Sequence, residues 1–353
     1  MMKRTILYFI LAAGLLCACA KDPKGGLNDD AYLYFESWIQ VNHPDAEHTA
    51  LGAYILEDTP GTGAAPGDPD LNPYIRVTAT SRSLSGTIQT TTEAQLAKQL
   101  GTYDDIDYYG PEIWDRSDNG LAAGLEEAIS TMRVGGSRTV AIPGWLLGYN
   151  STDGSFYRYD TAQEYLDKVS ASSATIYELT LEELIPDTDK WEADSCGRYI
   201  SRLFPGRSVL DSLEFGIYYF RTGEPSSTES FHEDTTLYVN YIGRRLDGTV
   251  FDTNIADTAK FYGLYSASSS YGPAAVSWYG DEESHTDITF TSYGSSSSSS
   301  VITGFSYALD QMHPHEQGTA IFISDWGYGT SGSGITIPGY SPLRFDFQIV
   351  DKP

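Results

Sequence analysis

The fold of the second half of this 353-residue chain is decided by residues 239–254, VNYIGRRLDGTVFDTN. Their first half alternates side chains at period two, and Asp247-Gly248 is a turn pair typical of antiparallel hairpins. The stretch therefore predicts two strands joined at this turn. Asp252 directly follows the apolar Phe251, so it is either a solvated residue at a strand end or a member of a pocket.

The composition is typical of a β-rich protein. The chain holds 26 Tyr, 14 Phe and 34 Gly, which favour strands and turns over helices. Its length is sufficient for two domains. The net charge of −26 is spread along the chain, which argues against a nucleic-acid partner because little would neutralise the phosphates.

The N-terminus has the pattern of an export signal. Lys3 and Arg4 precede an apolar run that is short for a membrane span, and small residues follow. The end of the run, LCAC at 16–19, resembles the bacterial lipobox, which implies that Cys19 is acylated; an ordinary secretory signal is the alternative. We expect a signal peptide at 1–18, a tether at 19–30, and a protein lipid-anchored to the outer membrane of a bacterial cell envelope, on its periplasmic or surface face. Cys196 would then be the one free thiol, leaving no intramolecular disulfide.

The two halves of the chain echo each other. VTATSRSLSGTI at 77–88 matches VNYIGRRLDGTV at 239–250, and YGP at 109–111 recurs at 271–273, both 162 positions apart. GLEEAISTM at 124–132 matches GFSYALDQM at 304–312. The last pair is 180 positions apart, so an insertion of 18 residues lies before it in the second half. Ordered echoes at one long spacing, with a single length change, indicate a duplicated domain, so we expect domains at 31–186 and 187–353.

Each half is predicted to contain a sheet and one short helix. Apolar residues recur at three-to-four spacing over 121–132 and 301–312, as in an amphipathic helix. PLRFDFQIV at 342–350 alternates as a half-buried strand. The fold class expected is α+β: two units, each a bent antiparallel sheet wrapped around one short helix, with long insertions near 93–119 and 257–300.

The second half resembles the FKBP-type peptidyl-prolyl cis-trans isomerases. The resemblance rests on an ordered series of motifs: Tyr241 with Gly243, Asp247-Gly248, Phe251-Asp252, VITGF at 301–305, Met312, Tyr328-Gly329, Ile337-Pro338, and Leu343 with Phe345. The sequence departs from the family pattern at Phe305, where Trp is usual, at His315, where Gly is expected, and in an insertion of roughly thirty residues after Asp252. Phe290 is a candidate for an aromatic position near the end of that insertion.

The resemblance implies a proline-binding pocket and an isomerase acting on proline-containing polypeptides, as a folding helper for exported proteins. Phe305 would receive the proline ring, Tyr328 and the backbone N–H of Ile302 would hold substrate carbonyls, and Asp252 would accept the Tyr241 hydroxyl. The implied site residues are Tyr241, Phe251, Asp252, Ile302, Phe305, Trp326, Tyr328, Ile337 and Phe345. The reaction needs no cofactor, and no metal is expected.

The first half resembles the same family without its chemistry. Ala79, Gln89 and Thr90 stand where the second half has Tyr241, Phe251 and Asp252, and Leu125 replaces the aromatic at the helix start. We therefore expect the first half to have the fold without the pocket.

Three alternatives stay open at this stage. The aromatic residues could form only a core, which is the usual reading of such clusters. Both domains could bind peptide without catalysis, or the aromatic residues at 262–279 could bind glycan if they formed a flat, exposed row. His313 and His315 could serve as metal ligands, although no cluster of Cys, Asp or Glu accompanies them.

Overall fold

The hairpin predicted at residues 239–254 is present in the computed structural model of the chain. Strand β12 (Thr236–Arg245) pairs antiparallel with β13 (Val250–Thr253). Gly248 has a φ of 100°, which suits a glycine at the turn. The structure describes residues 25–206, 212–229, 231, 235–278 and 288–353, so the expected signal peptide and Cys19 lie outside the described residues.

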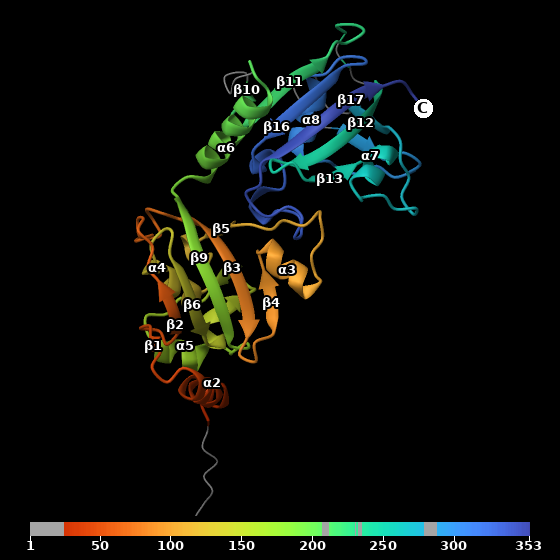
Figure 1. Cartoon of the computed structure of the whole chain (residues 1–353). Coiled ribbons are helices and arrows are strands. Elements are labelled where there is room, and N and C mark those ends of the chain that lie inside the picture. The colour runs from red at the N-terminus through yellow and green to blue at the C-terminus, as the bar shows by residue number, and fades with distance from the viewer. Residues whose placement is uncertain (1–24, 207–211, 230, 232–234, 279–287) are drawn as a thin grey trace, which may run out of the picture.

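Two antiparallel sheets follow one another along the chain (Figure 1). Among the described residues, the first sheet has the order β1-β2-β6-β9-β3-β4, with β5 also paired to β3. The second has the order β10-β11-β16-β17-β12-β14-β15, with β13 also paired to β12. The path β2-β6-β9-β3 of the first sheet corresponds to β11-β16-β17-β12 of the second, as a duplication requires.

The first sheet and its helices occupy residues 29–185. Its strands are β1 (Glu47–His48), β2 (Tyr54–Thr59), β3 (Tyr74–Ser83), β4 (Ile88–Thr91), β5 (Glu112–Asp115), β6 (Ser137–Ile142) and β9 (Thr175–Ile185), and a separate pair is formed by β7 (Tyr149–Asn150) and β8 (Ser155–Phe156). Its helices are α2 (Asp29–Asn42), α3 (Ala94–Leu100), η1 (Ser117–Asn119), α4 (Ala123–Ser130), η2 (Gly144–Leu147) and α5 (Ala162–Lys168).

The second sheet and its helices occupy residues 188–350. Its remaining strands are β10 (Ser212–Glu214), β11 (Ile217–Gly223), β14 (Ala274–Trp278), β15 (Ile288–Thr291), β16 (Gln317–Phe322) and β17 (Leu343–Val350). Its helices are α6 (Thr188–Leu203), α7 (Ala256–Phe261), α8 (Thr303–Asp310), η4 (Ser324–Trp326) and η5 (Gly329–Ser331). Only Pro186 and Asp187 connect β9 to α6.

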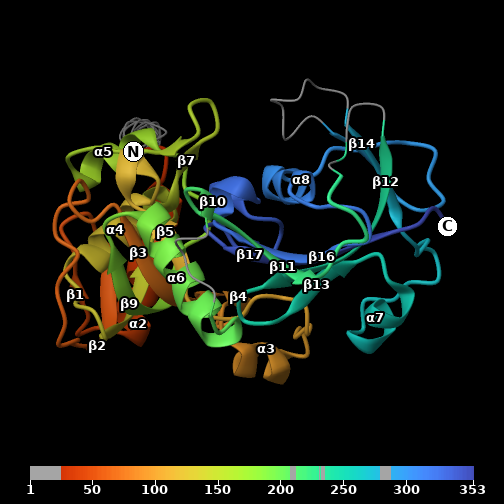
Figure 2. The same cartoon turned by 90° about the horizontal axis from the view of Figure 1, so that it is seen from above.

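The second sheet is covered on both faces because its strands alternate. Ala320 and Phe322 belong to the core that includes Phe305 and Leu309 of α8, whereas Ile321 packs with α6 on the opposite face. Figure 2 shows α8 lying against the sheet and α6 beside its far face. Cys196 of α6 is buried against the strand residues that point to this far face. It is the free cysteine of the described residues.

The expected fold class is confirmed: two α+β units, each with an antiparallel sheet around one short central helix, α4 or α8. The sequence analysis missed α6 and underestimated the insertions, which contain the helices α3 and α7 and the strands β5, β14 and β15. Ordered structure also begins slightly before Ala31. Asn28 is buried and its side-chain amide donates to the carbonyls of Leu166 and Val169, at 2.7 Å each.

Candidate functional site

The centre of the candidate site is the pair Tyr241 and Asp252, on the neighbouring strands β12 and β13. The Tyr241 hydroxyl donates to Asp252 Oδ2 at 2.9 Å. A register shift next to Gly243 interrupts the pairing of these strands. A Cβ at Gly243 would lie 2.9 Å from the Phe251 ring and 3.0 Å from the Phe345 ring, so only glycine allows both rings to approach the strand.

Partial removal from water raises the pKa of the Asp252 carboxyl above its ordinary value of 3.8. The hydrogen bonds from the Tyr241 hydroxyl and the Thr253 backbone oppose this effect but do not cancel it. The pKa of Tyr241 is also raised, first by desolvation and then by the Asp252 charge. Asp252 is thus solvent-accessible as a residue, yet its carboxyl lies in an environment poorer in water than a free surface.

A cluster of rings lies beneath this pair, centred on Phe305. The ring centroid of Phe305 is 5.4 Å from those of Tyr241 and Phe345, 5.7 Å from that of Phe290 and 4.8 Å from that of Phe347. All four contacts are edge-on, a favourable arrangement for aromatic pairs. Only 3% of Phe305 is exposed, so this ring forms a buried floor.

A cavity of about 270 Å³ opens on the Asp252 side of the cluster. Of the residues expected at the site, Tyr241, Phe251 and Asp252 line it, together with Phe290. Phe305 and Phe345 are in contact with these residues but not among those that line the cavity. Polar and aromatic residues of the insertion also line it: Ser269, Ser270, Tyr271, Ser292 and Tyr293.

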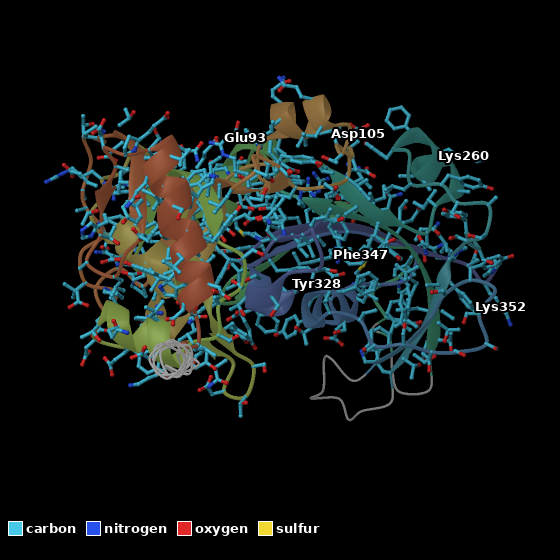
Figure 3. The ribbon with its side chains drawn as sticks, turned by 90° about the horizontal axis from the view of Figure 1, so that it is seen from below. Glu93, Asp105, Lys260, Tyr328, Phe347 and Lys352 are labelled. Atoms are coloured by element: carbon cyan, nitrogen blue, oxygen red, sulfur yellow. The ribbon has the colours of Figure 1, made fainter. Side chains whose placement is uncertain are left out.

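Tyr328 belongs to the same electrostatic environment. It lies just before η5 in the second domain (Figure 3), and 36% of it is exposed. Desolvation and, second, the Asp252 charge raise the pKa of its hydroxyl. The Asp252 carboxylate therefore acts on two tyrosines, Tyr241 and Tyr328.

Ile302 and Ile337 lie beside the ring cluster, at the start of α8 and in the core that contains Phe305. Ile302 is the N-cap of α8, and its carbonyl accepts the Phe305 N–H at 3.0 Å. Among the described residues no acceptor is bonded to the Ile302 N–H. Ile337 is 3% exposed within the core that contains Phe305, and its backbone is paired to Ser333.

Trp326 packs against the core that contains Phe305 and Phe345. Its indole N–H donates to the Phe215 carbonyl at 3.0 Å, and its ring contacts Tyr307 at 5.4 Å. Phe215 lies just before β11, so this hydrogen bond fixes the direction of the indole. The role of Trp326 as a pocket wall stays a prediction.

The sequence analysis missed Phe347 and Tyr271 as members of the site and held only a loose place for Phe290. The Phe347 ring lies 4.8 Å from Phe305, centroid to centroid. The alternation of residues 342–350 indicates that Phe347 is buried, and this was the available signal for it. Tyr271 was noticed only as part of a repeated motif. Phe290 contacts both Tyr241 and Phe305.

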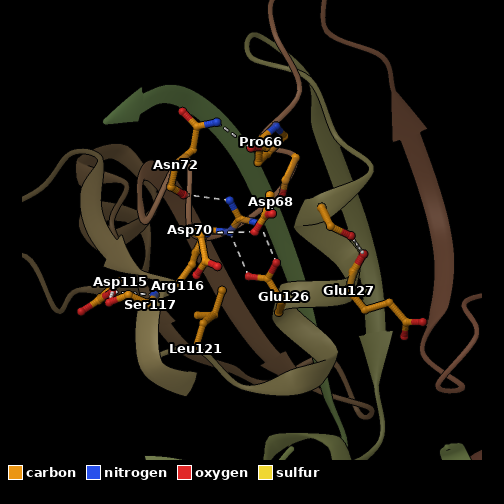
Figure 4. Close-up of polar contacts among 12 residues, drawn as sticks. Pro66, Asp68, Asp70, Asn72, Asp115, Arg116, Ser117, Leu121, Glu126 and Glu127 are labelled. Carbon is orange, nitrogen blue, oxygen red and sulfur yellow. Dashed lines mark hydrogen bonds and ion pairs between the residues drawn. The ribbon is translucent and has the colours of Figure 1, made fainter. Parts of the chain in front are cut away.

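The first domain has other chemistry at the matching positions. Thr90 pairs with Ser81 as Asp252 pairs with Gly243, and the two hydroxyls are 2.6 Å apart. Next to Leu125 in α4, Glu126 forms an ion pair: the buried Arg116 donates to both of its carboxylate oxygens, at 2.9 and 2.6 Å, as Figure 4 shows. Leu125 itself is buried in the first domain's core.

Among the described aromatic residues of the insertion, two form a stacked pair. Tyr265 and Tyr271 stack face to face, with centroids 5.1 Å apart and planes at 16°. The Lys260 amine lies 5.2 Å from the centroid of the Tyr265 ring. These two rings cover one another and do not lie side by side as in a flat row, whereas Tyr279 of the 262–279 stretch lies outside the described residues.

The histidines near residue 314 contact single carboxylates. His313 Nδ1 lies 3.0 Å from Glu316 Oε2, and His315 Nε2 lies 3.3 Å from Asp351 Oδ1. No group of three or more His, Cys, Asp or Glu side chains suited to a metal ion is found among the described residues. Within the same residues, no helix is both long and apolar enough to cross a membrane.

Comparison with known proteins gives partial matches. No protein family model matches the chain. A curated protein named macrophage infectivity potentiator, from Trypanosoma cruzi, is 27% identical over 155 residues, which are 43% of this chain and 62% of that protein. The chain therefore spans less than two thirds of this relative.

Two solved structures match the chain at low identity. The three FKBP domains of wheat FKBP73 match over 85% of this chain and 94% of that one, with 16% identity and a TM-score of 0.28. A peptidyl-prolyl cis-trans isomerase from Pseudomonas syringae matches over 46% of this chain and 93% of that one, with 19% identity and a TM-score of 0.29.

Proposed function

We propose that the second domain is a peptidyl-prolyl cis-trans isomerase. The observation that carries the proposal is the Tyr241–Asp252 hydrogen bond above a floor of aromatic rings and beside a cavity. A carboxylate beside core rings costs free energy unless it is paired, and here its partner is a tyrosine in the cavity wall.

The chemistry that such a site must perform is rotation about one bond. The barrier to rotation of a peptide bond is about 18–20 kcal/mol, and X-Pro bonds isomerise over tens of seconds or more. Twisting the amide removes its resonance and leaves a less polar carbonyl, so a dry pocket favours the twisted state over the planar one. The Asp252 carboxylate and the hydroxyls of Tyr241 and Tyr328 provide fixed polar groups at the edge of this pocket.

The substrates proposed are proline-containing segments of other exported proteins. The ring cluster suits the apolar proline ring, and the Ile302 N–H at the start of α8, which has no acceptor in the part of the chain that the structure describes, is suited to a peptide carbonyl. The proposal includes a lipid anchor at Cys19, which would keep the enzyme in the cell envelope with its clients. It assigns the chemistry to residues 187–353 and a non-catalytic role to residues 31–186.

A matched pair of full-length variants tests the proposal. Asp252→Ala should lower kcat/KM for an X-Pro peptide by about tenfold or more, because a factor of ten corresponds to about 1.4 kcal/mol of lost transition-state stabilisation. Thr90→Ala, at the matching position of the first domain, should leave the rate unchanged. Equal rates for the wild type and the folded Asp252→Ala variant, or an inactive wild type, would refute the assignment.

One observation favours a second candidate, peptide binding without catalysis. Phe305 replaces the usual Trp and is only 3% exposed, so it offers a proline ring little surface unless its neighbours move. A protein of this kind would bind proline-containing peptides and show no isomerase activity. Calorimetry with the assay peptide would then detect binding, while the isomerase assay with the same peptide would detect no turnover.

A further inference from the structure

Arg245 joins the two domains at the end of the site hairpin. It is 5% exposed, and its Nε donates to Asp247 Oδ2 at 3.1 Å within its own domain. Its Nη1 donates to the Ile106 carbonyl at 2.7 Å and also to the Thr336 carbonyl, and its Nη2 donates to the Asp107 carbonyl at 3.2 Å. One guanidinium thus holds backbone from both domains, a task suited to its fixed fork of donors.

Tyr108 of the first domain completes this contact. Its backbone N–H donates to the Ile335 carbonyl at 2.9 Å. Its ring centroid lies 5.5 Å from the Arg245 guanidinium carbon, within the range of a cation–π interaction. The carbonyls of Ile335 and Thr336 are therefore both held, immediately before Ile337, which is buried against the ring cluster.

The duplication shows which parts of this contact are specific to it. The insertions of both domains keep the same local structure: Lys98 lies over Tyr103, which stacks on Tyr109 at 5.0 Å, as Lys260, Tyr265 and Tyr271 do in the second domain. At the same spacing of 162 positions, Arg245 corresponds to Ser83 and Tyr108 to Ser270. Arg245 and Tyr108, the two side chains of the contact, thus stand at positions where the repeats differ.

We infer that the first domain holds the second domain's segment 335–337 in place for peptide binding, with Arg245 and Tyr108 as positioning residues. This inference rests on the proposed function, because the segment matters as the approach to Ile337. It gives the first domain a role that fits its lack of an aromatic site.

The test uses the full-length chain with Arg245→Met. Amide hydrogen exchange in residues 333–340 should become about tenfold faster, because the segment loses its hydrogen bond from Arg245 to the Thr336 carbonyl and the link that this side chain makes to residues 106–107. KM for an X-Pro peptide should rise about fivefold, while kcat changes by less than about twofold, since the groups beside the reacting bond are untouched. Arg82→Met, which removes the Arg82–Glu178 pair on the first domain's surface, is the control and should change neither quantity.

A second variant keeps the test decisive if Arg245→Met does not fold. Tyr108→Ser places the second domain's residue in the first domain and should give the same pattern with smaller changes. Wild-type exchange in residues 333–340 of a folded Arg245→Met variant would overturn the inference, and faster exchange with an unchanged KM would overturn its link to peptide binding. Faster exchange in a chain whose wild type has no isomerase activity would support the domain contact and refute the proposed function.

Discussion

Asp252 is the residue at which the second domain differs most clearly in chemistry from the first. Phe251 and Asp252 are adjacent on β13, yet Asp252 is bonded to Tyr241 and Phe251 contacts Phe345 at 5.7 Å. In the first domain Gln89 and Thr90 stand at these positions, and the Thr90 hydroxyl is bonded to the Ser81 hydroxyl. The adjacent pair therefore contributes a charged group and a ring to one cavity, which neither residue could do alone.

The raised pKa of Asp252 predicts a pH dependence of the isomerase activity. If the carboxylate is the active form, kcat/KM is at its full value above this pKa and falls as the pH decreases through it, at a pH above the 3.8 of an ordinary aspartate. A pH profile of kcat/KM for the wild type should show this inflection, and the uncharged Asp252→Asn variant should lack it. The same inflection in both proteins would assign the titration to another group.

The residues of the site were predictable to different degrees. Tyr241 and Asp252 could be placed from strand alternation and the resemblance together, because both belong to regular strands. The direction of the Trp326 indole could not be predicted, because this residue lies in the short helix η4, where no periodicity fixes the direction of a side chain. Phe347 was visible as a buried strand residue, but its contact with Phe305 depends on how the helix crosses the sheet.

At the scale of elements, α6 is the feature that most changes the second domain from the expected form. Its sequence, TDKWEADSCGRYISRL, buries Cys196, Tyr199 and Ile200 against the outer face of the sheet. Polar residues dominate the helix, so its apolar stripe is narrow and was not recognised. Glu192 lies on the buried side and accepts two hydrogen bonds from Ser324, from its backbone N–H at 2.6 Å and its hydroxyl at 2.7 Å.

The burial of Glu192 predicts a pH-dependent free energy of unfolding. Desolvation raises its pKa from 4.5 to about 7 in the folded state, so between these values the folded protein binds more protons than the unfolded chain. The stabilisation is complete below pH 4.5 and is lost as the pH rises through 7, to a total of about 3 kcal/mol at most. Chemical denaturation from pH 5 to 8 should show this decline in the wild type and not in Glu192→Gln.

The control for this prediction lies on the same helix. Asp194→Asn removes a carboxylate from the exposed side of α6, and its unfolding free energy should decline with pH as in the wild type. A decline that persists in Glu192→Gln would show that other groups cause it.

At the scale of the whole molecule, the duplication and the fold class could be predicted from the sequence, whereas the contact between the domains could not. The duplication shows as ordered echoes because each repeat keeps its strand order. The contact depends on Arg245 reaching the backbone carbonyls of Ile106 and Asp107, and any sequence supplies carbonyls. Only the three-dimensional arrangement shows which ones a guanidinium meets.

Lipidation at Cys19 is a prediction about the whole protein. If Cys19 is acylated, the mature wild type should partition with membranes and carry the mass of attached acyl chains. Cys19→Ala should lose the acyl mass and appear in the soluble fraction, because a net charge of −26 disfavours binding to anionic lipid. An unchanged lipid-sized mass in Cys19→Ala would rule out this site, and Cys17→Ala is the matched control.

The two-residue connection between β9 and α6 determines how strong the contact at Arg245 has to be. A short connection gives the joined domains an effective concentration on the order of millimolar or higher. A contact with a dissociation constant of about a millimolar between separate molecules is then formed most of the time. A few hydrogen bonds and one aromatic ring therefore suffice, where two free proteins would need a large interface. Since α6 begins directly after Pro186 and Asp187, the short connection keeps the two domains close together. This proximity is what allows residues 106–108 to act on the neighbouring domain.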